Sequence, residues 1–364
     1  MRKEVVSNKQ GISIVALFIW GSTLIIGTAG PAKKDAWFAV LLASLAAYPV
    51  MLMYSKILSS FMGKNIFEIN NLVFGNILGK IINVLYTWFA FHLGALVINN
   101  FMQFISTVGL PDTPKLPPIL FFTILCIWGV KEGIEVLGRW SELFIIFLIM
   151  MLCTTLPLSL TEANLDRIRP FLYEGIKPVI SGAILAFSFP FAETVVFTMA
   201  FCGFKNKNSP QKIFSYSLLL TTFFLILIAV RNAITTGERT LSMNYFPSYM
   251  VISRINVGEF IQRIETAATV SFLIAGFIKV SICLLAACKG VADILNYNEY
   301  RFLVTPVGLS MMSTSFIVYE SMLETSKWVV DVYPYYAIIF ELILPIITFI
   351  AMKIRKSQLS FSKT

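Results

Sequence analysis

The sequence predicts an all-α integral membrane protein whose ten transmembrane helices form two inverted repeats of five. Three observations lead to this prediction: an apolar composition, a series of long apolar stretches, and interruptions at corresponding positions of the two halves. Of the 364 residues, 57% are hydrophobic and 13% are charged, and the mean hydropathy is +0.77. Because about a quarter of the residues of a soluble domain are charged, this composition excludes an ordinary soluble fold.

Ten apolar stretches approach or exceed the roughly 20 residues that a helix needs to cross a bilayer. Short segments rich in turn and breaker residues, such as GPAKKD and GLPDTPKLPP, separate them. The chain 1–364 is therefore interpreted as one membrane domain, with a first repeat at 10–158 and a second at 178–354. The expected spans are 10–29, 36–59, 78–106, 117–135, 138–158, 178–203, 212–235, 262–290, 302–320 and 334–354.

The two longest connections, 159–177 and 236–261, are too polar to cross a membrane. The second mixes aromatic with small polar residues. It is compatible with short interfacial helices that cap a vestibule and equally with a plain loop.

The distribution of Lys and Arg predicts the orientation in the membrane. With the N-terminus inside, the inner segments carry 17 of these residues and the outer segments 10. We therefore expect both termini in the cytoplasm. The same bias accounts for the net charge of +9 without a nucleic-acid partner. The basic N-terminal segment has no small-residue cleavage site after it, so 10–29 is interpreted as a retained span.

Breaker residues occur at matching places in the first span of each half. The first span contains Gly21, Ser22, Thr23 and Gly27, and the sixth contains Pro190. Transporters built from inverted repeats bind substrate where such paired spans are interrupted. The alternative is that the glycines only permit close helix packing and that Pro190 makes a simple kink.

The ten-span plan, the GST of span 1 and the FPFAE of span 6 resemble the amino acid–polyamine–organocation transporter superfamily. More narrowly, the chain resembles the B subunits of bacterial spore germinant receptors. That resemblance rests on ISIVALFIWGSTLIIG, FPFAETVVF and RIETAATVSFLIAGFIKVSICLL taken together in their order and spacing. It implies a germinant-binding subunit of the spore inner membrane. Its partners would be an A subunit with a cytosolic domain and a C lipoprotein on the outer face.

The residues expected to contact a ligand come from both interruptions and from two further spans. Ser281 is included by resemblance to the family, although Leu285 stands where relatives often have an aromatic residue. Val97 is expected to line the cavity from span 3. The full set is Gly21, Ser22, Thr23, Val97, Ser188, Phe189, Pro190, Phe191 and Ser281.

Charged residues inside spans are functional candidates because they are costly in hydrocarbon. Glu193 could hold a substrate amine, bind a proton, anchor the broken helix or pair with a cation. Lys279 could replace a coupling cation or form a fixed ion pair. His92, the only histidine, could relay protons or form a helix–helix hydrogen bond. Arg231 and Glu341 are interpreted as interfacial or ion-paired.

The sequence contains no phosphate-binding loop, no zinc-protease motif, no nucleophile elbow and no CxxC pair. We therefore expect neither an enzyme nor a cofactor or metal. The five cysteines are interpreted as small membrane-embedded apolar residues rather than a disulfide framework.

Two principal functions follow. The first is a receptor subunit that senses a small nutrient, such as an amino acid, in a mid-membrane cavity. The second is a proton-coupled amino acid transporter of the same superfamily. A passive path for ions or water is a third role that the same fold could serve.

Overall fold

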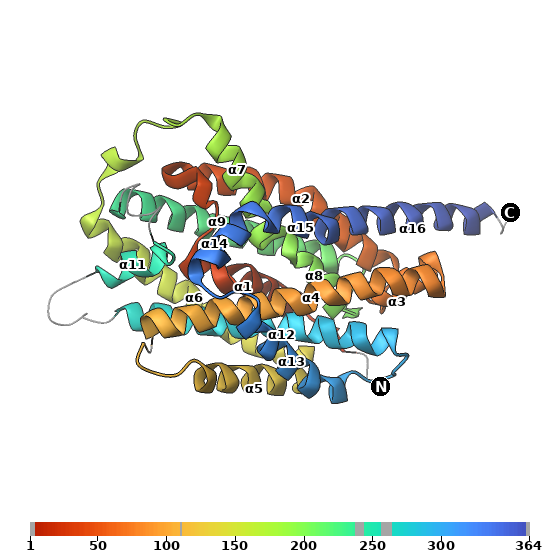
Figure 1. The fold of residues 1–364 in the computed structure, drawn as a ribbon. Coiled ribbons are helices and arrows are strands. Elements are labelled where there is room, and N and C mark those ends of the chain that lie inside the picture. The colour runs from red at the N-terminus through yellow and green to blue at the C-terminus, as the bar shows by residue number, and fades with distance from the viewer. Residues whose placement is uncertain (1–3, 110, 237–243, 256–263, 362–364) are drawn as a thin grey trace.

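The protein is described by a computed structural model, which covers residues 4–109, 111–236, 244–255 and 264–361. Within these ranges the chain is almost entirely helical (Figure 1). The helices are α1 (Asn8–Ile26), α2 (Ala36–Ser60), α3 (Ile66–Phe74), α4 (Asn76–Phe104), α5 (Leu116–Glu132), α6 (Ile134–Leu158), α7 (Ile176–Ala186), α8 (Val196–Ala200), α9 (Ser209–Thr236), α11 (Pro247–Ser253), α12 (Ile264–Ile294), α13 (Val304–Ile317), α14 (Met322–Asp331), α15 (Tyr333–Ile338) and α16 (Leu344–Phe361).

Short 3-10 and π turns connect or extend these helices. The 3-10 turns are η1 (Gly30–Asp35), η3 (Ser159–Glu162), η4 (Leu165–Ile168), η6 (Ala192–Val195) and η7 (Arg301–Leu303). The π turns are η2 (Ile105–Gly109), η5 (Phe187–Phe191) and η8 (Ile339–Ile343).

Each of the ten predicted spans contains helix, although the first two residues of the span 262–290 lie outside the described residues, and the count of ten crossings is not confirmed. Eight helices of the described ranges are long and apolar enough to span a membrane, and nine if the bent pair Arg301–Ile317 and Met322–Asp331 is one span. That pair bends by 100°. The remaining predicted span, 117–135, corresponds to α5, which has 17 residues and is therefore about 26 Å long, slightly less than a typical hydrocarbon core.

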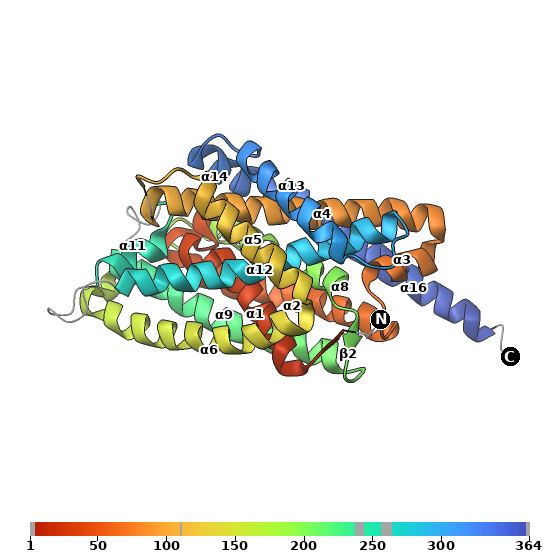
Figure 2. The same cartoon turned by 90° about the horizontal axis from the view of Figure 1, so that it is seen from below.

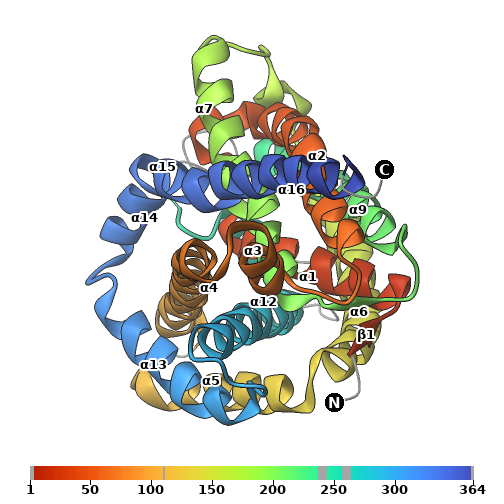
Figure 3. The ribbon, with the colours of Figure 1, turned by 90° about the vertical axis from the view of Figure 1, so that its right-hand side faces the viewer.

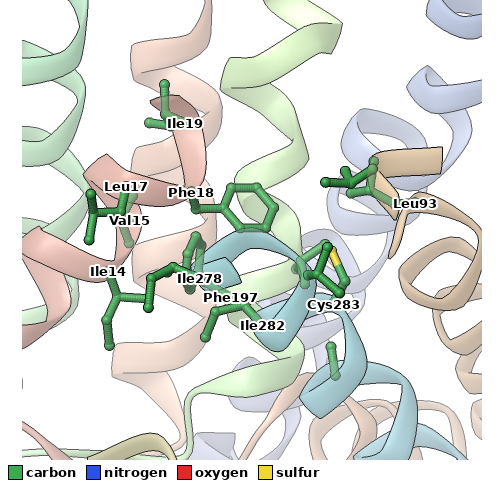
Figure 4. Packing of buried hydrophobic residues seen from close by; sticks show 14 of the residues in the cluster. Ile14, Val15, Leu17, Phe18, Ile19, Leu93, Phe197, Ile278, Ile282 and Cys283 are labelled. Carbon is green, nitrogen blue, oxygen red and sulfur yellow. The ribbon is translucent and has the colours of Figure 1, made fainter. Parts of the chain in front are cut away.

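Helices α1 and α12 form the centre of the bundle, and Figure 3 shows them surrounded by the other helices. Most of the apolar window is buried in α1 (78%) and α12 (83%), compared with 28% in the span that contains α6. Phe18 of α1 packs edge-on against Phe197 of α8, 5.0 Å between ring centroids, and Figure 4 places Ile278 and Ile282 of α12 beside them. The central helices are thus shielded from lipid, so they can carry polar groups.

The sixth span is broken, as the sequence predicts. Helix α7 ends at Ala186, the π turn η5 and the 3-10 turn η6 follow, and α8 resumes the helix at Val196. Phe189 has the extended dihedrals φ −126° and ψ 105°, and the peptide bond before Pro190 is cis. Pro190 has no N–H to donate and its ring crowds the preceding turn, so a continuous helix is disfavoured here.

The first span is interrupted at Gly27, the last of its four predicted breaker residues, and not at the other three. Helix α1 runs unbroken through Gly21, Ser22 and Thr23 and ends at Ile26. Gly27 then takes a φ of +78° and Ala29 a φ of +58° before η1 begins. Gly21 lies within the helix and leaves room for the side chain of Lys279. A Cβ at this position would lie 2.7 Å from Cδ of Lys279.

A two-stranded parallel sheet ties the N-terminal segment to the end of the broken span. Strand β1 (Val5–Val6) pairs with β2 (Gly203–Phe204), which follows α8, with Val5 opposite Gly203. Figure 2 shows β2 next to the N-terminus, and Figure 1 shows both termini at one end of the bundle.

The connection 236–261, part of which lies outside the described residues, contains the short helix α11. The alternative of a short helix in this connection is therefore confirmed. Helix α3, between the second and third predicted spans, and helix α14 are additional elements that the span assignment did not include.

Candidate functional site

A cavity of about 660 Å³ is lined by the C-terminal turns of α1, α4 and α9 and by residues of η1, α11 and α14. Glu193 and Tyr333 also line it, and Figure 1 shows α11 and α14 away from the end that carries the termini. This volume lies within the range of pockets that bind small molecules. The polar lining residues include Thr23, Thr28, Lys33, Asn100, Gln103, Asn232, Thr325 and Ser326, and the apolar ones include Ile26, Leu93, Leu96, Leu185, Leu225, Ile228 and Phe246.

An ion pair lies at the floor of this cavity. Nζ of Lys279 is 2.5 Å from Oε2 of Glu193, and both side chains are fully buried. The hydroxyl of Tyr333 donates to Oε1 of Glu193, also at 2.5 Å. Both oxygens of the carboxylate therefore have partners, and each partner comes from a different helix.

The local sequence explains how these three groups meet. Glu193 belongs to the short turn η6 directly after the Pro190 break, which aims it inward from the broken span. Lys279 is the middle residue of α12, about 22 Å along the helix from either end, so its ammonium cannot reach water at the membrane surface. Tyr333 begins α15, beside a wall formed by α14.

Aromatic rings cover the lysine head group. Nζ of Lys279 is 4.8 Å from the centroid of the Phe189 ring and 5.1 Å from that of Phe18. Both distances are within cation–π range, so the rings compensate part of the lost hydration. The lysine stem passes over Gly21, which explains the packing role of that glycine.

The backbone at the break is held by groups from neighbouring elements. The Thr28 hydroxyl donates to the carbonyl of Phe189 at 2.8 Å, and the Tyr54 hydroxyl lies 3.3 Å from that of Ala192 and closer to that of Glu341, between which its one proton is shared. The loop after α1 thus satisfies a carbonyl that the broken span releases. In an apolar environment such a carbonyl must find a partner within the protein or in a polar cavity.

The structure gathers some of the predicted ligand residues around the cavity and places others behind its walls. Thr23, Val97, Phe189 and Glu193 line the cavity. The buried residues that do not line it are Gly21, Ser22, Ser188, Pro190, Phe191, Lys279 and Ser281. The Ser188 hydroxyl donates to the carbonyl of Ile184 within its own helix, which directs it away from the opening.

His92 lies in an aromatic cluster rather than on the cavity wall. Its ring stacks on Trp88 with a centroid distance of 5.4 Å and an interplanar angle of 9°. The rings of Trp328 and Tyr336 contact its other sides edge-on. These ring contacts connect α4 with α14 and α15, while Nδ1 of His92 has no hydrogen-bond partner among the described residues, so the predicted helix–helix hydrogen bond is replaced by aromatic packing.

Helix α14 forms much of one cavity wall and is held there by hydrogen bonds. Nε2 of Gln103 donates to Oγ1 of Thr325 at 2.7 Å and to Oδ1 of Asn99 at 2.6 Å. The span assignment missed these wall residues. A local signal was present, because Ser321 and Glu324 have the S-x-x-E spacing of a helix start, and the Ser321 hydroxyl accepts from the Glu324 N–H.

Arg231 and Glu341 were interpreted as interfacial or ion-paired, and the structure shows an ion pair for neither among the described residues. Both lie inside the bundle, with 3% and 0% of their surface exposed. Arg231 donates through Nε and Nη2 to Oδ1 of Asn232. Neither carboxyl oxygen of Glu341 has a hydrogen-bond partner among the described residues. Both helices turn these polar residues toward the protein because burial against lipid would cost more.

Polar contacts close the end of the bundle that carries the termini. Glu4 accepts from Tyr300 at 2.9 Å and from Lys289 at 3.4 Å, and Lys289 also donates to the carbonyl of Ala200 at 2.7 Å. Burial and the Glu4 carboxylate raise the pKa of the Tyr300 phenol above its ordinary value, so this hydroxyl stays a donor at neutral pH. The N-terminal segment, α8 and α12 are thereby joined below the cavity.

Within the described ranges, no group of three or more His, Cys, Asp and Glu side chains is arranged to hold a metal ion. The chemistry that the site supports is recognition of a small molecule by hydroxyl, amide and aromatic groups above a neutralised ion pair.

We predict that Lys279 and Glu193 are strongly coupled in stability. Removing one partner of a buried ion pair typically costs about 3–5 kcal/mol because the other charge stays buried and unpaired. Lys279→Met and Glu193→Gln should each destabilise the protein, and the double variant should be more stable than the sum of the two losses indicates. Thermal unfolding of the four proteins in detergent measures this coupling.

The matched control is the pair Lys33–Glu174, which also has a 2.5 Å contact but side chains 36% and 39% exposed. Its coupling should not exceed about 1 kcal/mol, since water screens it. Equal coupling in the two pairs would contradict the assignment of a buried, unscreened ion pair.

The chain was compared with known proteins. The family model described as "Spore germination protein" matches residues 5–323. Spore germination protein KB of Bacillus subtilis (strain 168) is 26% identical over 368 residues, covering 100% of this chain and 98% of that protein.

Two solved structures share the fold. MhsT in complex with L-phenylalanine superposes with a TM-score of 0.68 at 12% identity, covering 96% of this chain and 89% of that one. Mhp1, a nucleobase-cation-symport-1 family transporter with bromovinylhydantoin bound, superposes with a TM-score of 0.66 at 15% identity, covering 93% and 78%. These matches confirm the predicted class of fold, and at such identities they show the fold alone.

Proposed function

Because the chain belongs to the spore germination protein family, we propose that it is the membrane subunit of a germinant receptor and binds a small nutrient in its cavity. The observation that carries this proposal is the position of the Lys279–Glu193–Tyr333 group. Glu193 and Tyr333 line the cavity at the break of the sixth span, and Lys279 pairs with Glu193 behind the cavity wall. Transporters with interrupted spans place their ligands at such breaks.

The cavity favours a small ligand without net charge. Glu193 faces the cavity, but its charge is balanced by Lys279, so the floor offers polarity without a net charge. The amide side chains of Asn100, Gln103 and Asn232 line the cavity together with apolar side chains. This combination suits a neutral amino acid, and MhsT, which shares the fold, holds L-phenylalanine in its solved complex.

Binding is proposed to act by shifting an equilibrium between two arrangements of the bundle. A ligand can do so only through different affinities for the two states. Among the cavity walls, helix α14 is the best suited to move when a ligand binds. It is separated from α13 by a bend of 100° and is hydrogen-bonded to α4 through Thr325 and Gln103. A change in α14 would also reach Tyr333, which directly follows it and contacts Glu193.

The protein is proposed to work in the spore inner membrane with an A subunit and a C lipoprotein, both termini facing the cytoplasm. Relatives that include Spore germination proteins KB, B2 and A2 support an assembly of this kind. The excess of Lys and Arg at the end with the termini supports the orientation.

We expect the ligand to stabilise the protein only if no introduced side chain fills the cavity. The proposed measurement is a thermal shift of the purified chain across a panel of L-amino acids and hexoses. Ala229→Trp fills the cavity wall on α9 and should abolish any shift that the wild type shows. Leu219→Trp on the same helix, where Leu219 is 69% exposed, should leave the shift unchanged. A shift that survives Ala229→Trp would place the ligand elsewhere.

The second candidate is a proton-coupled amino acid transporter, which the similarity to MhsT and Mhp1 favours. Uptake by the purified chain in liposomes with an imposed pH gradient distinguishes the two. The receptor proposal predicts no accumulation of an amino acid that produces a thermal shift. Robust accumulation driven by the gradient would instead establish transport.

A further inference from the structure

Glu341 is a buried acid for which the cavity and its ion pair offer no explanation. Its side chain has no exposed surface, and neither carboxyl oxygen has a hydrogen-bond partner among the described residues. By contrast, both oxygens of Glu193 are hydrogen-bonded. A carboxylate buried without partners costs several kcal/mol or more, so such a group is held as the neutral acid instead.

The backbone at Glu341 is also irregular. The residue is the centre of the π turn η8, which connects α15 with α16. The hydroxyl of Tyr54 donates to the Glu341 carbonyl. Single π turns within helices frequently occur at functional sites. The irregular turn and the unpartnered acid coincide in one residue of an otherwise apolar span.

Among the described residues, one cation interacts with Glu341, and that cation is already paired. Lys279 interacts electrostatically with Glu341 but gives its hydrogen bond to Glu193, whose negative charge opposes a second carboxylate nearby. The remaining titratable groups that face Glu341 are neutral phenols. From the elements packed around η8, the titratable side chains are Tyr54, Glu193, Lys279, Tyr333 and Tyr336, with Tyr86 beyond Tyr54 and His92 beyond Tyr336.

Polar side chains continue from Glu341 toward the end that carries the termini. Thr348, two helical turns further along α16 and about 10 Å away, is also fully buried. Its hydroxyl donates to Asn70, which donates to Asn83, and Asn83 donates to the carboxylate of Asp293 at 2.8 Å. Glu341 therefore lies between the cavity floor and a polar network that reaches the opposite end.

We propose that the Glu341 carboxyl is a proton-binding site, which holds one proton as a neutral acid beside the Lys279–Glu193 pair. The bound proton changes the combined charge of Glu193, Lys279 and Glu341 from minus one to zero. Because Glu341 and Tyr333 belong to the same span, in η8 and α15, displacement of that span relative to α2 and η6 would alter the proton's access to water. The site does not depend on the identity of any cavity ligand.

Infrared spectroscopy of the full-length protein in lipid bilayers tests the proposal. A protonated carboxylic acid has a carbonyl stretch that carboxylates lack and that shifts in D2O. At neutral pH the wild type should show this band and Glu341→Gln should lose it. The control Glu299→Gln, at an exposed residue paired with Arg301, should retain it. A wild type without the band, or a band that persists in Glu341→Gln, would overturn the proposal.

Thermal unfolding of the same variant gives an independent result. Gln resembles the neutral acid in shape and charge, so Glu341→Gln should unfold at the same temperature as the wild type or higher. A lower unfolding temperature, or failure to accumulate as a folded protein, would show that Glu341 is an anion that the fold requires.

Discussion

The ion pair between Lys279 and Glu193 joins the two elements on which the rest of the site depends. One charge belongs to α12, the candidate span with the largest buried share in the described part of the chain, and the other to the turn after the break of the sixth span. Neither charge can reach water, so each is tolerated only while the other is in place. The Pro190 break, the missing side chain at Gly21 and the two aromatic rings over the ammonium all serve this contact. Without these contacts, the non-helical backbone at the break would lie in the membrane without hydrogen-bond partners.

The cavity follows from the same arrangement. Its floor is the neutralised pair with the Tyr333 hydroxyl, and its walls come from segments that leave the helical bundle: the loop after α1, helix α11 and helix α14. On the side of the termini, the contacts of Glu4 with Lys289 and Tyr300 and the small β1–β2 sheet hold the bundle closed. A ligand that enters the cavity would therefore meet the polar groups of Glu193 and Tyr333. These groups lie next to Phe189, where the backbone of the sixth span is not helical.

Much of this architecture could be predicted from the sequence, since the thickness of a bilayer determines the length of apolar stretches and proline interrupts helices for local reasons. The spans and the break at Pro190 were predicted for these reasons. Gly21 and Lys279 were each identified from the sequence, but their contact was not. The lysine stem packs over the glycine, and the two residues belong to distant segments of the chain. The position of the first interruption at Gly27 and the burial of Glu341 likewise depend on packing between helices. Helix α14 was missed because its sequence is too polar for a span, although its first residues carry a helix-start pattern.

The pair itself is open to direct observation. Solid-state NMR of the protein in lipid bilayers, with 15N in the lysine side chains and 13C in the glutamate carboxyls, measures dipolar coupling between the two nuclei. A contact of 2.5 Å between Nζ of Lys279 and Oε2 of Glu193 predicts a strong coupling that disappears in Lys279→Met and persists in Lys33→Met. A spectrum unchanged by Lys279→Met would contradict the account, because Lys279 and Glu193 would then not be partners.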